Sequence, residues 1–127
     1  QNASSLAEIK DRSTSKPFLI SVDSFSTLKT FTRVPKVHKH TIRKAHKTTF
    51  AYPCGLAIRV VKEESHLQFL KKLKWSYSTS SNPSGKAFDE IFAQENANVI
   101  VFTCKGFFES KPSSIMRLGK SKIKKLR

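Results

Sequence analysis

The sequence predicts a single α/β domain built around a twisted mixed sheet. Its 127 residues suit one hydrophobic core, and an apolar content of 38% with ten Phe and four Gly excludes a disordered or fibrous chain. Short runs of strand-forming residues alternate with helical patterns, some as hairpin-like neighbours and some separated by a helix. That order is typical of a mixed sheet rather than a helical bundle or a β-sandwich.

The first half of the chain is predicted to form two short helices, a basic helix and three strands. Pro17 and Asp23 bound a strand over 18–22, and Pro53-Cys54-Gly55 forms a loop between two antiparallel strands. In chain order we expect a helix that Ser5 caps and that ends near Arg12, the strand 18–22, a helix that Ser24 caps, an exposed basic helix over 35–45, and strands over 48–52 and 56–61.

The second half is predicted to alternate helices and strands. In chain order we expect a helix that Ser65 caps and that carries Leu67 to Leu73, a strand over 75–79, a polar loop over 80–86, a helix over 87–94, a strand over 98–103, and terminal strands near 114–118 and 123–127. Strands 18–22, 56–61 and 98–103 are the most apolar, so we expect them to be central in the sheet.

The chain is strongly basic, with 24 Lys and Arg against nine Asp and Glu and a formal charge of +15. Such a field attracts polyphosphates, nucleic acid or an anionic surface, although a generally basic proteome would give the same composition. Residues 36–47 concentrate the charge and predict an RNA-binding face made of Lys39, Arg43, Lys44 and Lys47. No run of about 18 apolar residues predicts a membrane span.

Cysteine and histidine usage indicates neither a disulfide framework nor a metal site. Cys54 and Cys104 lie far apart without a CxxC motif, so we expect free thiols and a cytoplasmic location, with a structural disulfide as the alternative. His38, His40 and His46 could be drawn as metal ligands, but residues two apart on a helix point away from each other. No metal ligand is therefore expected from the protein.

Three polar segments are candidates for ligand contacts. Lys10 to Pro17 places three cations around a turn, where Arg can fork onto phosphate oxygens. Ser78 to Gly85 gathers hydroxyls in the loop that follows a predicted strand, and Pro112 to Arg117 places two serines before another strand. Taken singly, each segment is equally compatible with a solvated polar turn.

Taken together, these segments resemble the YrdC/YciO-like family across essentially the whole chain. The order is KxRxxxKP before an apolar strand, an Arg within GLAIRV, then STSxNxSG, PSSI and a closing Leu126-Arg127. The resemblance implies synthesis of threonylcarbamoyl-adenylate from L-threonine, bicarbonate and ATP with Mg²⁺, in a YrdC-like domain with a basic concave face. It also implies tRNA or double-stranded RNA as a partner, together with the proteins that transfer the threonylcarbamoyl group to tRNA.

The resemblance assigns roles to individual residues. It implies that ATP is bound by Arg12, Lys16, Gly55, Ser80 and Arg127, that L-threonine is held by Ser78, Arg59 and Ser113, and that Lys10 and Asn82 shape the pocket. Arg59 is the natural partner of the threonine carboxylate. No catalytic base or nucleophile is expected, because adenylation can proceed through positioning and electrostatic stabilisation.

The sequence also departs from the family pattern. The N-terminal strand and the PTxTxYG segment have no counterpart after Gln1, and Ser21 stands where the family commonly has His. We therefore expect an N-terminally truncated or degenerate member. The alternative function is a catalytically weakened paralogue that acts as an RNA- or nucleotide-binding module.

Overall fold

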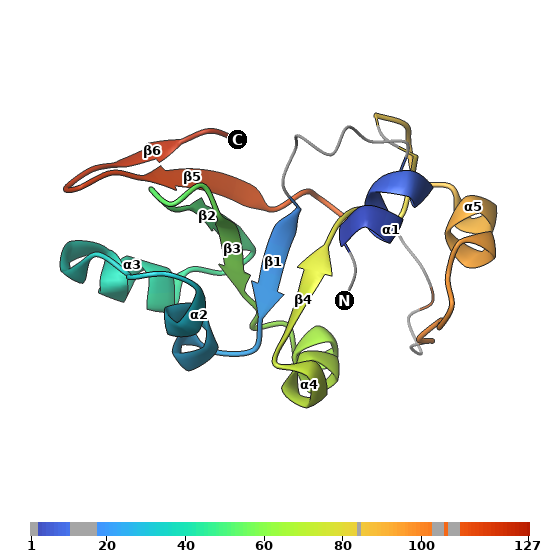
Figure 1. Cartoon of the computed structure of the whole chain (residues 1–127), viewed down its shortest axis with the longest axis horizontal. Helices are drawn as coiled ribbons and strands as arrows, with labels where there is room; N and C mark the ends of the chain where they lie inside the picture. Colours follow the sequence, from blue (N-terminus) through green and yellow to red (C-terminus); the bar gives the residue numbers. More distant parts are fainter. Residues whose placement is uncertain (1–2, 11–17, 84, 103–105, 107–109) are drawn as a thin grey trace. The chain divides into compact units, whose positions relative to one another are not determined.

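The computed structural model describes residues 3–10, 18–83, 85–102, 106 and 110–127. By its internal contacts the chain divides into two compact units. We call residues 17–78 with 113–127 the sheet unit, and residues 1–16 with 79–112 the minor unit. The elements of both are labelled in Figure 1. The single domain expected from the chain length stays a prediction.

The sheet unit contains one six-stranded mixed sheet, which confirms the predicted α/β class. Its strands are β1 (Leu19–Val22), β2 (Thr48–Ala51), β3 (Ala57–Val60), β4 (Trp75–Ser78), β5 (Ser114–Leu118) and β6 (Ile123–Lys125). The spatial order is β4-β1-β3-β2-β5-β6, with β1/β3 and β2/β5 parallel and the other pairs antiparallel. The predicted antiparallel pair around Pro53-Cys54-Gly55 is thus confirmed as β2 and β3.

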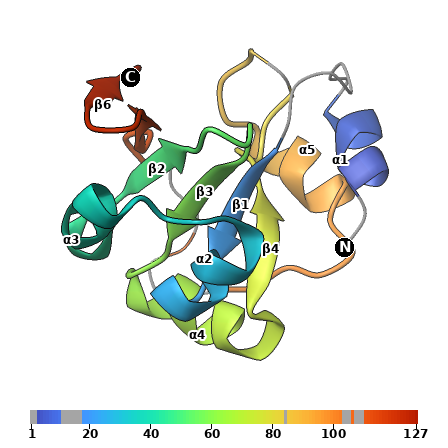
Figure 2. The same cartoon turned by 60° about the vertical axis from the view of Figure 1, so that its left-hand side comes forward.

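One face of this sheet carries the hydrophobic core. Ile20 pairs with Ile58 and Val22 with Val60, so side-chain alternation brings the apolar members of β1 and β3 onto a common face. Figure 2 shows α2 (Phe25–Phe31) in front of these strands, with α3 (Lys39–Lys44) beside them. Leu28 of α2 is fully buried, and Ile42 of α3 is 2% exposed in the same cluster. Burial on this face therefore leaves the opposite face of β1 and β3 for polar side chains.

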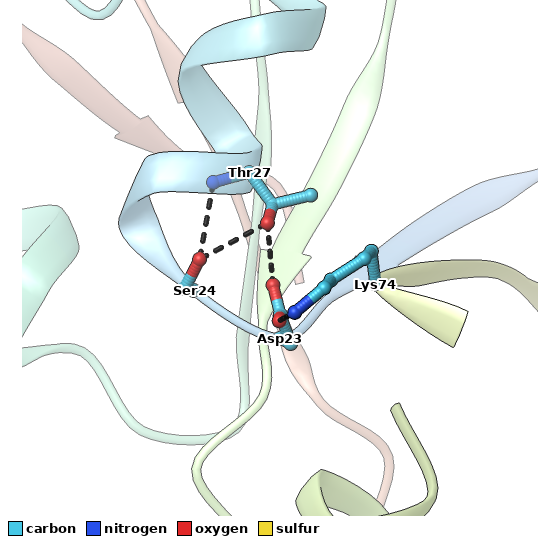
Figure 3. A network of polar contacts seen from close by, with 4 residues as sticks. All are labelled: Asp23, Ser24, Thr27 and Lys74. Atoms are coloured by element: carbon cyan, nitrogen blue, oxygen red, sulfur yellow. Dashed lines mark hydrogen bonds and ion pairs between the residues drawn. The ribbon is translucent and has the colours of Figure 1, made fainter. Parts of the chain in front are cut away.

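The N-terminus of α2 is held by a polar network that Figure 3 shows. Ser24 Oγ accepts a hydrogen bond from the backbone N–H of Thr27 at 3.1 Å, which confirms Ser24 as the cap. The Thr27 hydroxyl donates to Asp23 Oδ1, and Lys74 Nζ lies 3.7 Å from Asp23 Oδ2. The pKa of Asp23 is lowered: its burial would raise it, but the bonds from Thr27 and Ser24 and the charge of Lys74 together prevail.

This network predicts a pH-dependent contribution to stability. Because the folded-state pKa of Asp23 is below the ordinary 3.8, its contribution is fully present above that value and is lost as pH falls through the folded-state pKa. We expect Asp23→Asn to lower the free energy of unfolding by about 0.5–1 kcal/mol at pH 7 and by progressively less in acid. Urea unfolding between pH 7 and pH 3 measures this difference, and parallel profiles for both proteins would contradict it.

The helix boundaries correct several details of the sequence-based expectations. Helix α4 spans Glu64–Leu73 and is capped by Glu63, whose carboxylate accepts from the N–H groups of Ser65 and His66 at 3.2 and 2.8 Å. Ser65 was therefore wrongly predicted as the cap. The expected basic helix is divided into a 3₁₀ turn over Lys36–His38 and α3. His38 is 5% exposed, so this element is not solvated throughout.

The minor unit contains two short helices among its described residues. Helix α1 spans Ala3–Ile9, so Ser5 lies within the helix and does not cap it. Helix α5 spans Glu90–Glu95, starts later than the predicted 87–94, and is capped by Asp89, whose carboxylate accepts from Phe92 N at 3.0 Å. Because an aspartate carboxylate is a favourable N-cap, the helix begins directly after Asp89 and not at residue 87.

The prediction of a central strand over 98–103 is wrong for its described part. Residues 98–102 form no strand, and the side chains of Val99 and Phe102 are 78% and 73% exposed. The six-stranded sheet is built without them, with β2 and β4 flanking the central β1 and β3. Strand propensity leads to a strand only where a neighbouring strand offers hydrogen bonds and burial, and the described sheet contains no strand that pairs with this run. Thr103 lies outside the described residues.

Candidate functional site

The polar face of the sheet unit brings together hydroxyl groups and one guanidinium. Ser21 on β1 pairs with Arg59 on β3, and Leu19 pairs with Ser78 on β4. Since Phe50 and Ile58 face each other in the core, their neighbours Thr49 and Arg59 point to the other side. Four strands therefore contribute to one polar surface.

Arg59 is the centre of this surface. Its Nη2 donates to Ser21 Oγ at 3.3 Å and to Ser78 Oγ at 3.4 Å, while its Nε is buried without a hydrogen-bond partner. Burial lowers the pKa of the guanidinium. Among the described residues no carboxylate forms an ion pair with it. A desolvated cation that contacts only neutral hydroxyls is costly, and it suits a bound anion.

His66 is a neighbour that the sequence analysis missed. Helix α4 carries it close enough for the charge of Arg59 to act on it: burial lowers the pKa of His66 most, Arg59 lowers it further, and Glu63 opposes them. The imidazole is therefore neutral at pH 7. No motif in the sequence marks this histidine, because only the return of α4 beside the sheet brings it near Arg59.

Ser113 and Arg127 meet at the start of β5. The Nε and Nη2 of Arg127 donate to the carbonyl oxygen of Ser113 at 3.3 and 3.1 Å, and Ser113 Oγ lies 3.5 Å from Thr49 Oγ1. Thr49 is 1% exposed and sits on the same face as Arg59. The structure thus places two residues predicted for different ligands, Ser113 for threonine and Arg127 for ATP, in direct contact.

Gly55, also predicted for ATP, lies in the turn between β2 and β3. It has φ +86°, and a Cβ added to it would meet no atom within 4 Å. The left-handed backbone, and not a close approach by a neighbour, is what favours glycine here. Its N–H donates to the carbonyl oxygen of Tyr52 at 3.0 Å. The residue therefore has a structural role in the turn, and its ATP contact stays a prediction.

In the minor unit, Lys10 organises the loop that follows β4. Its side chain is 4% exposed, and its ammonium group donates to the backbone carbonyls of Ser80, at 2.8 Å, and Asn82. The amide of Asn82 in turn donates to the carbonyls of Pro83, at 3.1 Å, and Lys86. Both residues therefore hydrogen-bond within this loop, and their role in shaping a ligand pocket stays a prediction. Arg12 and Lys16 lie outside the described residues, so their roles stay predictions.

The four residues predicted for RNA binding differ in their surroundings. The Arg43 guanidinium stacks over the ring of Phe25 at 4.4 Å, while Lys44 and Lys47 are exposed. Lys39 instead lines a cleft at the end of α2. They do not form one uniform solvated face, because α3 packs its Ile42 and Arg43 against the rest of the unit.

Other predicted features concern metals, thiols and membranes. Within the described ranges, no three His, Cys, Asp or Glu side chains are grouped to hold a metal ion. Cys54 is exposed, and Cys104 lies outside the described residues, so their oxidation state stays a prediction. None of the helices in the described part of the chain is both long and apolar enough to span a bilayer.

Comparison with known protein families agrees with the sequence motifs. The chain matches the Sua5/YciO/YrdC family, which carries the description telomere recombination, over residues 1–127. No curated protein and no solved structure shows significant similarity to the chain. The family match extends over the sheet unit with its Arg59 surface and over the minor unit with its Lys10 loop. The chain is therefore a member of the Sua5/YciO/YrdC family.

Proposed function

We propose that this chain binds L-threonine through Arg59 and forms threonylcarbamoyl-adenylate from threonine, bicarbonate and ATP, for the modification of tRNA. The observation that carries the proposal is the half-buried guanidinium between two hydroxyls, with its Nε buried and no described carboxylate to neutralise it. A ligand carboxylate would accept charge-assisted bonds from the Arg59 side chain. Ser78 would supply a neutral donor beside it.

In this reaction the amino group of L-threonine forms a bond to the carbon of bicarbonate, and water leaves, which gives a carbamate. An oxygen of this carbamate then attacks the α-phosphorus of ATP. The new bond joins that oxygen to phosphorus, the bond from the α-phosphorus to the bridging oxygen breaks, and pyrophosphate leaves with the electron pair. Fixed cations that align two anions lower this barrier without a protein nucleophile. Arg12, Lys16, Ser80 and Arg127 are the proposed contacts to the nucleotide.

Mg²⁺ fits this scheme as an ion that arrives on the triphosphate. The described residues provide no group of carboxylates for it, and Mg²⁺ commonly binds through substrate phosphates with few protein ligands. When bound, it would neutralise charge on the leaving pyrophosphate. The chain's own cations would then orient the nucleotide.

The decisive experiment is to titrate both the parent chain and its Arg59→Ala variant with L-threonine. Loss of a charge-assisted contact costs about 1.5–3 kcal/mol, so we expect affinity to fall about 10- to 150-fold. Arg117→Ala is the matched control, because Arg117 is an exposed arginine on β5, and its affinity should equal that of the parent chain. Isotope exchange between pyrophosphate and ATP that requires both threonine and bicarbonate would then establish adenylation. Equal affinity in Arg59→Ala would remove Arg59 from the site.

A second candidate function, an RNA-binding module with weakened catalysis, is favoured by the distribution of charge. The sheet unit holds 18 basic residues (Lys and Arg) against three acidic residues (Asp and Glu), whereas the minor unit holds six basic and six acidic residues. The whole formal charge of +15 therefore falls on the sheet unit. A generally basic composition would be spread over both units, so this segregation favours a basic binding surface. Threonine and RNA binding without isotope exchange would identify this function.

A further inference from the structure

A basic cleft of about 690 Å³ opens in the sheet unit at the C-terminal end of α2. Five cations line it and no acidic residue does: Lys29, Arg33, Lys36, Lys39 and Lys120. Val34, Pro35 and Pro53 add apolar wall surface. The helices and turns on the core-covering side of the sheet form this cleft, whereas Arg59 belongs to the opposite face. It is therefore distinct from the proposed threonine site.

The walls of the cleft are tied together by contacts between distant parts of the sequence. His38 Nε2 lies 3.0 Å from the carbonyl oxygen of Gly119, which joins the 3₁₀ turn to the turn between β5 and β6. Thr32 Oγ1 lies 3.3 Å from Cys54 Sγ, which joins the end of α2 to the turn between β2 and β3. These contacts hold Lys36 and Lys120 on facing segments of the cleft. The cations are thus brought together by the fold and not by their spacing in the sequence.

The charge around the cleft is not neutralised within the sheet unit. No Asp or Glu occurs from Ser24 to Lys62 or from Ser110 to Arg127, the two stretches that supply all its lining residues. Beyond the cleft, exposed cations continue along α3 and along the β5–β6 hairpin; they include Lys44, Lys47, Lys122, Lys124 and Lys125. One small anion would neutralise few of these charges. An extended polyanion would neutralise many of them and release counterions.

We propose that this cleft is the main nucleic-acid contact of the chain, with backbone phosphates bound by Lys36, Lys39 and Lys120. The sugar of the same nucleotide packs on Pro35 and Pro53, the accessible apolar residues of the wall, since the cleft volume falls in the range of small-ligand sites. The proposal rests on the proposed action on RNA and assigns it a surface. It also revises the sequence-based RNA face, because among its four members only Lys39 lines the cleft.

Binding of a fluorescent RNA hairpin across a salt series tests this assignment. The cleft variant is Lys36→Gln with Lys120→Gln, and the matched control is Lys71→Gln with Lys72→Gln, which removes equal charge from exposed positions on α4, outside the cleft. Each lost phosphate contact should reduce the log–log slope by about 0.7–0.9, so the cleft variant should lose about 1.4–1.8. At 0.1 M salt its affinity should be about 25- to 60-fold weaker. An equal effect in the control variant would overturn the proposal.

A chemical footprint provides an independent reading. Cys54 is exposed and adjoins Pro53 of the cleft wall, so bound RNA should slow its alkylation by iodoacetamide, as followed by mass spectrometry of the Cys54 peptide. Unchanged alkylation at saturating RNA would contradict the assignment. Anionic vesicles of phosphatidylserine provide the comparison: tighter binding to vesicles than to the hairpin would also overturn it.

The failures of the two proposals can be told apart. If the unmodified chain binds no RNA at low salt, the cleft assignment fails, whereas threonine affinity and its dependence on Arg59 are measured separately. If Arg59→Ala leaves threonine affinity intact while the cleft variant loses RNA affinity, the cleft stands and the threonine site fails. The two sites share no residue, so each variant reports on one of them.

Discussion

Replacing Arg59 by methionine is expected to stabilise the fold and to weaken threonine binding about 10- to 150-fold. The guanidinium loses solvation on burial and gains only two long hydrogen bonds, at 3.3 and 3.4 Å, to neutral hydroxyls. Methionine keeps a flexible stem of similar length and removes the buried charge. Replacement of buried charges by apolar side chains can stabilise a protein by 1–4 kcal/mol. For this partly exposed site we expect a rise of about 1–2 kcal/mol in the free energy of unfolding.

Urea unfolding with and without L-threonine measures both effects together. The parent chain should gain more stability than Arg59→Met when the same concentration of threonine is added, because the variant binds the ligand more weakly. Arg117→Met is the control, and its free energy of unfolding should change by less than about 0.5 kcal/mol, since Arg117 is exposed. A loss of stability in Arg59→Met would mean that the guanidinium supports the fold and is not reserved for a ligand.

Leu28→Ala should destabilise the sheet unit by about 2–5 kcal/mol. Leu28 is fully buried where α2 packs on β1 and β3, in one cluster with Ile20, Val22 and Ile58. Truncation removes apolar contacts and leaves a cavity that α2 cannot fill without moving away from the sheet. The free energy of unfolding in urea is the measurement.

Val37→Ala is the matched control for the Leu28 variant. Val37 is 65% exposed in the 3₁₀ turn, so shortening it should change the free energy of unfolding by less than about 0.5 kcal/mol. If Leu28→Ala lost no more stability than this control, α2 would not be part of the core. A comparable loss in both variants would place the core elsewhere.

Local signals in the sequence were sufficient for several elements of the sheet unit, including β1, the start of α2 and the β2–β3 turn. Strand β1 lies between Pro17 and Asp23 as predicted. Ser24 caps α2 because its hydroxyl oxygen accepts a hydrogen bond from the backbone N–H of Thr27, three residues later. The Pro53-Cys54-Gly55 turn joins β2 and β3 because Gly55 adopts a positive φ. Such signals act within a few residues, so no distant contact is needed to read them.

Signals that depend on a distant partner were misread. The apolar run 98–102 has the composition of a central strand but is largely exposed, and no edge of the sheet accepts it. The basic stretch was read as one solvated helix, yet His38 is buried against Gly119 and Arg43 covers Phe25. Burial in each case was decided by residues far away in the chain, which periodicity does not report.

The sequence by itself determined the family, the alternation that places Arg59 opposite the core, and the residue types available to bind anions. Only the tertiary structure decided that Arg59 donates hydrogen bonds to Ser21 and Ser78. It also decided that Lys120 lines the same cleft as Lys36 and Lys39. The physical reason is that motifs and alternation are local properties of the backbone. The cost of burying a guanidinium, and the repulsion among clustered cations, depend instead on which strands become neighbours.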